Sequence, residues 1–339
     1  MLSLLEYNMT IKVAVIGVGA MGRNHVRVYY EVPGVQLVGV SDVDVDAAAA
    51  ATRLYATKTY GDFRQMLDET QPDAVTIAVP TEHHLEVALE VIQRGIHLLI
   101  EKPIASTVEE GQQIIDAAAK AGVCLQIGHI ERFNPAVIAL RQQLAENALG
   151  KVYQIDARRQ GPFPGRIKDV GVVVDLAVHD IDIIRYITGA EITRVFAETA
   201  QHIHDTREDM LTGLLRLDNG AVGTLTINWL TPTKIRELYV TGERGMFRVD
   251  YLTQDLYFFE NAAAPVGDWP FLNLRGVNEG RMIRQVVAKK EPLRAELESF
   301  LAAVRGEKPV PITGQDGLKS LALAQAIVES GLTFQPLSF

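Results

Sequence analysis

A histidine and two acids are the residue types best suited to chemistry in this sequence, and they lie close together in the segment Gly171–Ile187. The segment reads as a helix, and at 100° per residue Asp175, His179 and Asp182 fall within a narrow arc. Histidine is the usual general acid or base near neutral pH, and a carboxylate one turn away can orient its ring or hold a substrate. The alternatives are a solvent-facing acidic helix face and a metal site. No third ligand stands at a recognisable spacing, so we expect no metal.

A lysine follows directly on a candidate strand. The apolar run Ile96–Ile100 predicts a buried strand, and Glu101-Lys102-Pro103 comes next. Ligands of open parallel sheets bind beyond the carboxyl ends of the strands, so Lys102 is expected at a ligand cleft. The alternative is a surface lysine in a salt bridge.

A glycine motif stands near the start of the chain. Gly17-Val18-Gly19-Ala20-Met21-Gly22 ends the apolar run Ile11–Ile16 and opens a helical stretch. In this context the glycines let a diphosphate approach backbone N–H groups at a helix N-terminus. Asp42 follows twenty residues after Gly22, where an acid can bind both ribose hydroxyls of NAD, and no basic residue nearby could receive the extra phosphate of NADP. The pattern predicts an NAD site; the alternative is a structural glycine turn in another α/β protein.

Four cations gather between a predicted strand and the helix of His179. They suit a phosphate or diphosphate, because arginine offers bidentate contacts. The alternative is a solvated loop whose charges pair with acids such as Glu131 or Asp169. The four are Arg158, Arg159, Arg166 and Lys168.

The elements that must position these residues change character along the chain. Strand and helix patterns alternate up to Val123–Ile127, which predicts a parallel sheet. After residue 150 alternating strands dominate, and Asn219-Gly220 is a strong hairpin signal. We expect an α/β protein with an N-terminal Rossmann domain (9–128), an α+β domain with a large, mostly antiparallel open sheet (129–317), and a C-terminal helix (318–339) that packs back on the first domain. The stretch Asn261–Gly280 reads as loop.

Composition and sequence pattern limit the partners that the protein can bind and the compartment in which it is expected. A net charge of −9 argues against a nucleic-acid binder. The single cysteine, Cys124, cannot form an intrachain disulfide, and Met1–Asn8 does not resemble a signal peptide, so the cytoplasm is the expected compartment. No apolar run is long enough to span a membrane. The predicted sheet has too few helices to cover both faces, so a homodimer or homotetramer is expected.

Taken together, the motifs resemble the Gfo/Idh/MocA family, named for glucose–fructose oxidoreductase, inositol dehydrogenase and a rhizopine catabolism protein. The resemblance covers nearly the whole chain. It implies that Lys102, Asp175 and His179 form the catalytic group, with His179 taking a hydroxyl proton and Lys102 stabilising the reacting oxygen, roles that the two can exchange. It also implies NAD as cofactor. The residues that carry it are Ala14–Gly22, Pro80 with His84 four residues later, Glu101-Lys102-Pro103, Asp175, His179 and Asp182.

His84 and Glu101 are thereby implied to lie near the nicotinamide end of the cofactor, and Pro80 and Lys102 to take part in binding it. A narrower resemblance, carried by Gly128–Pro135 and by the segment from Arg159 to Arg166, is to the members that oxidise nucleotide sugars, UDP-N-acetylglucosamine 3-dehydrogenases among them. It implies hydride transfer from carbon 3 of such a sugar to NAD+. The residues implied to hold the substrate are Arg132, Asn134, Arg159, Arg166, Asp175 and His179.

The sequence is also compatible with two other functions. One is an NAD-dependent dehydrogenase of a free polyol or sugar, of the inositol type. The other is a non-catalytic sensor or scaffold that binds NAD.

Overall fold

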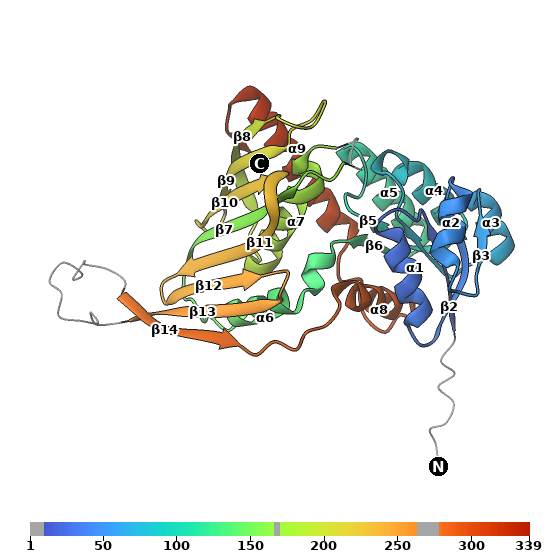
Figure 1. Cartoon of the computed structure of the whole chain (residues 1–339), viewed down its shortest axis with the longest axis horizontal. Helices are drawn as coiled ribbons and strands as arrows, with labels where there is room; N and C mark the ends of the chain where they lie inside the picture. Colours follow the sequence, from blue (N-terminus) through green and yellow to red (C-terminus); the bar gives the residue numbers. More distant parts are fainter. Residues whose placement is uncertain (1–9, 166–169, 263–277) are drawn as a thin grey trace, which may run out of the picture. The chain divides into compact units, whose positions relative to one another are not determined.

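The chain divides into two compact units. The computed structural model describes residues 10–165, 170–262 and 278–339 (Figure 1). The first unit comprises Met1–Ile130 and Leu293–Leu321, and the second comprises Glu131–Pro292 and Ala322–Phe339. We expected the chain to leave the N-terminal domain at residue 128 and to return to it only with the C-terminal helix, residues 318–339. In the structure, the returning stretch is Leu293–Leu321.

The first unit is built on a six-stranded parallel sheet in the order β3-β2-β1-β4-β5-β6. This confirms the predicted Rossmann architecture. The strands are β1 (Ile11–Ile16), β2 (Val35–Ser41), β3 (Lys58–Tyr60), β4 (Ala74–Ile77), β5 (His97–Glu101) and β6 (Leu125–Gly128).

The helices of the first unit alternate with these strands, and a late helix completes its core. Leu297, Phe300 and Leu301 of α8 are buried with Val26 and Tyr29 of α1. Burying side chains of this size contributes roughly 1.5–3 kcal/mol each, which explains why the chain returns here. The helices are α1 (Gly22–Glu31), α2 (Val45–Thr52), α3 (Phe63–Thr70), η1 (Thr81–His83), α4 (His84–Gln93), α5 (Val108–Ala121), α8 (Pro292–Val304) and the beginning of α9 (Gly314–Thr333).

The second unit is built on a nine-stranded sheet in the order β14-β13-β12-β11-β7-β10-β9-β8-β15. Only β7 and β10 pair in parallel; the other described pairs are antiparallel, as predicted. The strands are β7 (Val152–Pro162), β8 (Ile192–Ala200), β9 (Met210–Leu217), β10 (Val222–Asn228), β11 (Leu230–Gly242), β12 (Gly245–Asp250), β13 (Asp255–Ala262), β14 (Asn278–Gln285) and β15 (Leu337–Ser338).

One face of this sheet is covered and the other is open. Along β9, Leu211 and Leu215 are buried while Thr212 and Leu214 are exposed, which is the period of two expected for a half-buried strand. The helices on the covered face are α6 (Pro135–Ala145), η3 (Val173–Ala177), α7 (Val178–Thr188) and the later part of α9 (Figure 1). The short helix η2 (Ile130–Phe133) precedes α6.

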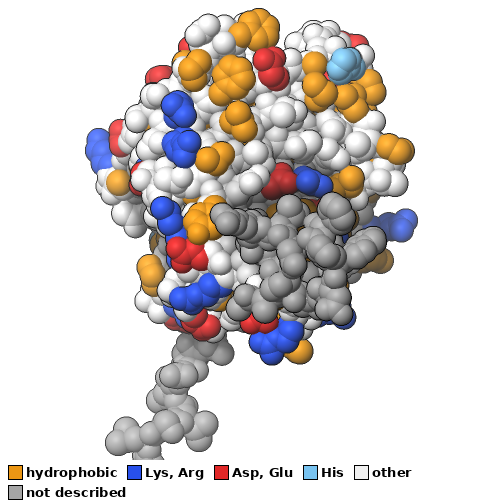
Figure 2. Space-filling model, turned by 90° about the vertical axis from the view of Figure 1, so that its left-hand side faces the viewer, with side chains coloured by type: hydrophobic (Ala, Val, Ile, Leu, Met, Phe, Trp, Pro, Cys, Tyr) orange, Lys and Arg blue, Asp and Glu red, His pale blue; other side chains and the backbone are white. Residues whose placement is uncertain are grey.

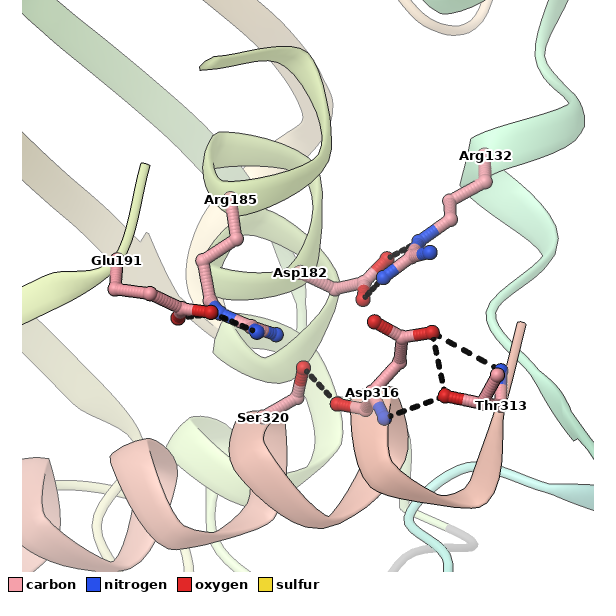
Figure 3. A network of polar contacts seen from close by, with 7 residues as sticks. All are labelled: Arg132, Asp182, Arg185, Glu191, Thr313, Asp316 and Ser320. Atoms are coloured by element: carbon pink, nitrogen blue, oxygen red, sulfur yellow. Dashed lines mark hydrogen bonds and ion pairs between the residues drawn. The ribbon is translucent and has the colours of Figure 1, made fainter. Parts of the chain in front are cut away.

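Several predicted boundaries differ from the structure. The C-terminal helix begins at Gly314 rather than at residue 318, because Thr313 and Asp316 cap it reciprocally through their side chains (Figure 3). The later part of this helix contributes Leu323 and Ile327 to the core of the second unit, where we had expected packing on the first domain. The predicted loop Asn261–Gly280 contains the end of β13 and the start of β14. No helix in the described parts of the chain is long and apolar enough to cross a membrane.

Candidate active site

The glycine loop after β1 has the geometry of a diphosphate cradle. Gly17 has a φ of +89°, and a Cβ there would lie 2.6 Å from the carbonyl oxygen of Ala78. A Cβ at Gly22 would lie 1.9 Å from the carbonyl oxygen of Gly17, so both positions require glycine. A Cβ at Gly19, in contrast, would meet no atom within 4 Å. The backbone at Gly19 therefore borders open space just before α1, where a diphosphate could approach.

Asp42 lies beside this loop. Its Oδ2 accepts a hydrogen bond of 2.8 Å from the backbone N–H of Val18, and its Oδ1 accepts one of 2.9 Å from the N–H of Asp44. Each carboxylate oxygen can accept a further hydrogen bond. The loop and the acid fit the diphosphate and the adenosine ribose of NAD.

Lys102 follows the carboxyl end of β5, and His84 braces the loop around it. His84 is 1% exposed, and its Nδ1 and Nε2 lie 2.9 Å and 3.1 Å from the carbonyl oxygens of Pro103 and Val79. Burial lowers the pKa of His84, which favours a neutral ring that donates to one of the two carbonyls. The ring of His84 therefore lies between the turn at Pro80 and the loop of Lys102. Its ring contacts the protein backbone at both nitrogens.

Glu101 belongs to a buried polar cluster that the sequence did not reveal. Its Oε1 lies 2.8 Å from Nε2 of His25, which is fully buried in α1. A Cβ at Gly128 would lie 3.1 Å from Oε2 of Glu101, so a larger residue on the neighbouring strand would crowd the carboxylate. Glu296 of α8 is fully buried nearby, and neither of its carboxyl oxygens has a hydrogen-bond partner among the described residues. Burial and then the charge of Glu101 raise the pKa of Glu296 well above its usual value.

The helix that carries His179 begins as a π-helical turn, not as the regular α-helix we predicted. Asp175 lies in this turn, η3, and His179 lies at the start of α7; both are half-buried. A π turn spaces residues differently from an α turn, so the spacing of 100° per residue used for the predicted arc does not apply at Asp175. Asp182 is 1% exposed and points into the interior.

The arginines predicted to hold the substrate are buried in ion pairs within the second unit. Arg132 donates from Nε and Nη2 to both oxygens of Asp182, at 2.7 Å and 2.6 Å (Figure 3). Arg159 donates from the same two nitrogens to Asp180, at 2.7 Å and 3.2 Å, and from Nη1 to Glu131 at 3.0 Å. Burial alone would lower the pKa of Arg159, but the two acids outweigh it and raise that pKa. Arg159 thus pairs with Glu131, an acid named in the alternative interpretation, although it lies buried on β7 and not in a solvated loop.

Asn134 has a structural partner at each end of its amide. Its Oδ1 accepts from the N–H of Ala136 and caps α6, and its Nδ2 donates to the carbonyl oxygen of Tyr251. Arg166 and Lys168 lie outside the described residues. Within the described ranges, no group of three His, Cys, Asp or Glu side chains is arranged to hold a metal ion.

Two family models match this chain. Residues 11–129 match the oxidoreductase family with an NAD-binding Rossmann fold, and residues 137–248 match the C-terminal domain of the Gfo/Idh/MocA proteins. The chain belongs to the Gfo/Idh/MocA family. Its first unit is accordingly the NAD-binding domain of an oxidoreductase.

Individual relatives within this family differ in substrate. The chain is 33% identical to UDP-N-acetylglucosamine 3-dehydrogenase from Acidithiobacillus ferrooxidans, over 93% of this chain and 95% of the relative. A solved structure of that enzyme matches with a TM-score of 0.83 and covers 96% of this chain and 98% of its own. Inositol 2-dehydrogenase 2 from Saccharopolyspora erythraea is 28% identical, over 96% of this chain and 94% of the relative.

Proposed function

We propose that the protein oxidises a secondary alcohol of a UDP-sugar, most simply UDP-N-acetylglucosamine at carbon 3, with NAD+ as the hydride acceptor. The observation that carries the proposal is the 33% identity to UDP-N-acetylglucosamine 3-dehydrogenase over 93% of the chain. The inositol dehydrogenase at 28% identity keeps oxidation of a free polyol as the rival.

The glycine loop and Asp42 would hold NAD, which supplies a hydride acceptor when bound. His179 would take the hydroxyl proton, since imidazole exchanges protons near neutral pH. Asp175, in the turn before it, would orient the ring or bind a neighbouring hydroxyl. Lys102 would hydrogen-bond the reacting oxygen and stabilise the negative charge that develops on it. The proposal requires Lys102 and His179 to reach the same hydroxyl group.

We also propose that the open face of the nine-stranded sheet joins two copies of the chain. Leu214 on that face is 50% exposed, in a strand whose other face is buried. The molecular face drawn in Figure 2 carries hydrophobic side chains as well as charged ones of both signs. A shallow depression on the open face is lined by Asp156, Arg158, Gln160, Thr212, Gly213, Leu214, Thr224, Leu225, Thr226, Ile235 and Glu237.

The substrate proposal is tested by NADH formation from three compounds: UDP-N-acetylglucosamine, free N-acetylglucosamine and myo-inositol. Alcohol oxidation by NAD+ is often uphill, so a coupled reaction should remove the keto product. We expect a higher kcat/KM for the UDP-sugar than for both uncharged compounds. Faster oxidation of either uncharged compound would replace this proposal by the rival.

A further inference from the structure

The second unit contains a further inward-facing arginine whose environment differs from those of Arg132 and Arg159. It is Arg236 of β11, which pairs in register with Arg159 of β7 and is half-buried. Its two neighbours along β11, Glu237 and Ile235, line the open face. Because side chains alternate along a strand, Arg236 points to the covered face, where Asp175 and His179 also lie.

The guanidinium of Arg236 is fixed by the backbone and leaves one edge for another partner. Its Nη1 donates to the carbonyl oxygens of Gln160 and Ile235. Its Nε and Nη2 have no partner among the described residues, and no carboxylate there lies within ion-pair distance of it. In Arg132 and in Arg159, the same two nitrogens donate hydrogen bonds to both carboxylate oxygens of an aspartate. A guanidinium edge of this kind matches the two oxygens of a carboxylate or phosphoryl group.

A break in the strand register makes room beside this edge. Leu230 pairs with Pro162 and Ile235 with Gln160, so residues 231–234 bulge opposite the single residue Gly161. A Cβ at Gly161 would lie 3.7 Å from Nη2 of Arg236 and 3.6 Å from Cγ of Lys234. Both cations therefore flank a position that has no side chain of its own. Lys234 is exposed and forms no ion pair with any described residue.

The electrostatics of Arg236 favour an incoming anion. Burial, and then repulsion by Arg159, lower the pKa of Arg236 to about 10, although Asp180, Glu131 and Asp175 act in the opposite direction. The positive charge is thus held at a cost in free energy that a bound anion would offset. Asp175 is among the acids whose charge acts on Arg236, so Arg236 lies near Asp175, which is expected to act beside His179.

We propose that Arg236, with Lys234 beside it, binds the phosphoryl group attached to the sugar of the substrate. This rests on the proposed function, because a free polyol has no anion to offer. It assigns the anion to a residue pair that the sequence did not single out. Arg132 and Arg159 then have a structural role, because their charges are balanced by Asp182 and Asp180.

The test compares Arg236→Met and Arg236→Lys with wild type in three measurements: KM for UDP-N-acetylglucosamine, the inhibition constant of UDP, and the Kd of NAD. We expect Arg236→Met to raise the first two by roughly 10- to 100-fold, the size of a charge-assisted hydrogen-bond pair, and to leave the third unchanged. Arg236→Lys should raise KM and the UDP inhibition constant by a smaller factor, because lysine keeps the positive charge. Lys234→Met should weaken the binding of UDP by a smaller factor than Arg236→Met does. Arg284→Met is the matched control, since Arg284 is an exposed arginine of the same sheet that pairs with Asp255.

The outcomes separate this inference from the proposed function. If wild type oxidises the UDP-sugar and Arg236→Met leaves both KM and UDP inhibition unchanged, the proposed function stands and the assignment of Arg236 fails. If KM rises only for a UDP-sugar with a carboxylate on its ring, and UDP inhibition is unchanged, Arg236 binds that carboxylate and the phosphoryl assignment fails. If wild type oxidises only uncharged polyols, both fail. Should Arg236→Met not fold, Arg236→Lys and Lys234→Met decide by the same two constants.

Discussion

Replacing Glu296 by glutamine should remove a pH-dependent loss of stability. In the native protein, burial and the charge of Glu101 raise the pKa of the Glu296 carboxyl well above its usual value. In the unfolded chain the same carboxyl titrates near 4.5. Between these two pKa values the native state binds one proton more than the unfolded chain. The stability that this group contributes is therefore complete below pH 4.5 and is lost as pH rises toward the native pKa.

The magnitude follows from that single proton. One extra bound proton changes the free energy of unfolding by about 1.4 kcal/mol per pH unit. Glutamine has nearly the same shape and does not titrate, so its own burial cost does not vary with pH. The stability of Glu296→Gln relative to wild type should thus increase by about 1.4 kcal/mol per pH unit above pH 4.5 and level off at the native pKa.

Urea denaturation of the ligand-free protein, at one protein concentration and at unit steps of pH, measures this difference. The infrared carbonyl band of a protonated carboxyl group, present in wild type and reduced in the variant, gives a second readout. The matched control is Glu298→Gln on the same helix, because Glu298 is half-exposed and pairs with Arg294 at 2.9 Å. Glu298→Gln should change the free energy of unfolding by no more than about 1 kcal/mol at every pH. A difference for Glu296→Gln that does not vary with pH, or an equal slope in the control, would refute the reasoning.

Three further predictions concern the cofactor, the chemistry and the assembly. The protein should bind NAD(H) more tightly than NADP(H), because Asp42 would repel the additional phosphate; dissociation constants of the two cofactors test this, and equal or tighter NADP binding contradicts it. Lys102→Ala and His179→Ala should each lower turnover by roughly 100- to 10,000-fold while NAD binding is kept; near-wild-type rates in both variants would reject the assigned roles. Light scattering at micromolar concentration should give the mass of a dimer or tetramer, and Leu214→Glu should reduce it, whereas a monomeric mass for wild type would exclude the proposed interface.

The local motifs were readable from the sequence because their structural requirements are local. Gly17 and Gly22 are needed by the tight turn itself, and Asp42 follows at the spacing that the strand and helix between them impose. The hairpin at Asn219-Gly220 is likewise confirmed, with Gly220 at a φ of +88°. The alternation of strands and helices in the first unit followed from the same kind of pattern, except for β3 and α3, which were not predicted.

The partners of the charged residues could not be read in this way, because they depend on tertiary packing. Nothing near Arg159 in the sequence indicates that Asp180 will meet it, since the two are 21 residues apart and on different elements. The helix over Pro135–Ala145 was missed, although Asn134-Pro135 is a capping signal that could have shown it. The special position of Arg236 arises from a register break in β11 that no periodicity predicts.

The return of Leu293–Leu321 to the first unit has a consequence for biosynthesis. The core of that unit lacks Leu297, Phe300 and Leu301 until those residues have been made. A chain emerging from the ribosome can therefore form the parallel sheet early, but the surface that α8 covers stays open to water until synthesis is nearly finished. The N-terminal domain, although first in the sequence, is completed only after most of the second unit has emerged. For the same reason, a fragment cut at residue 130 would lack part of its own hydrophobic core.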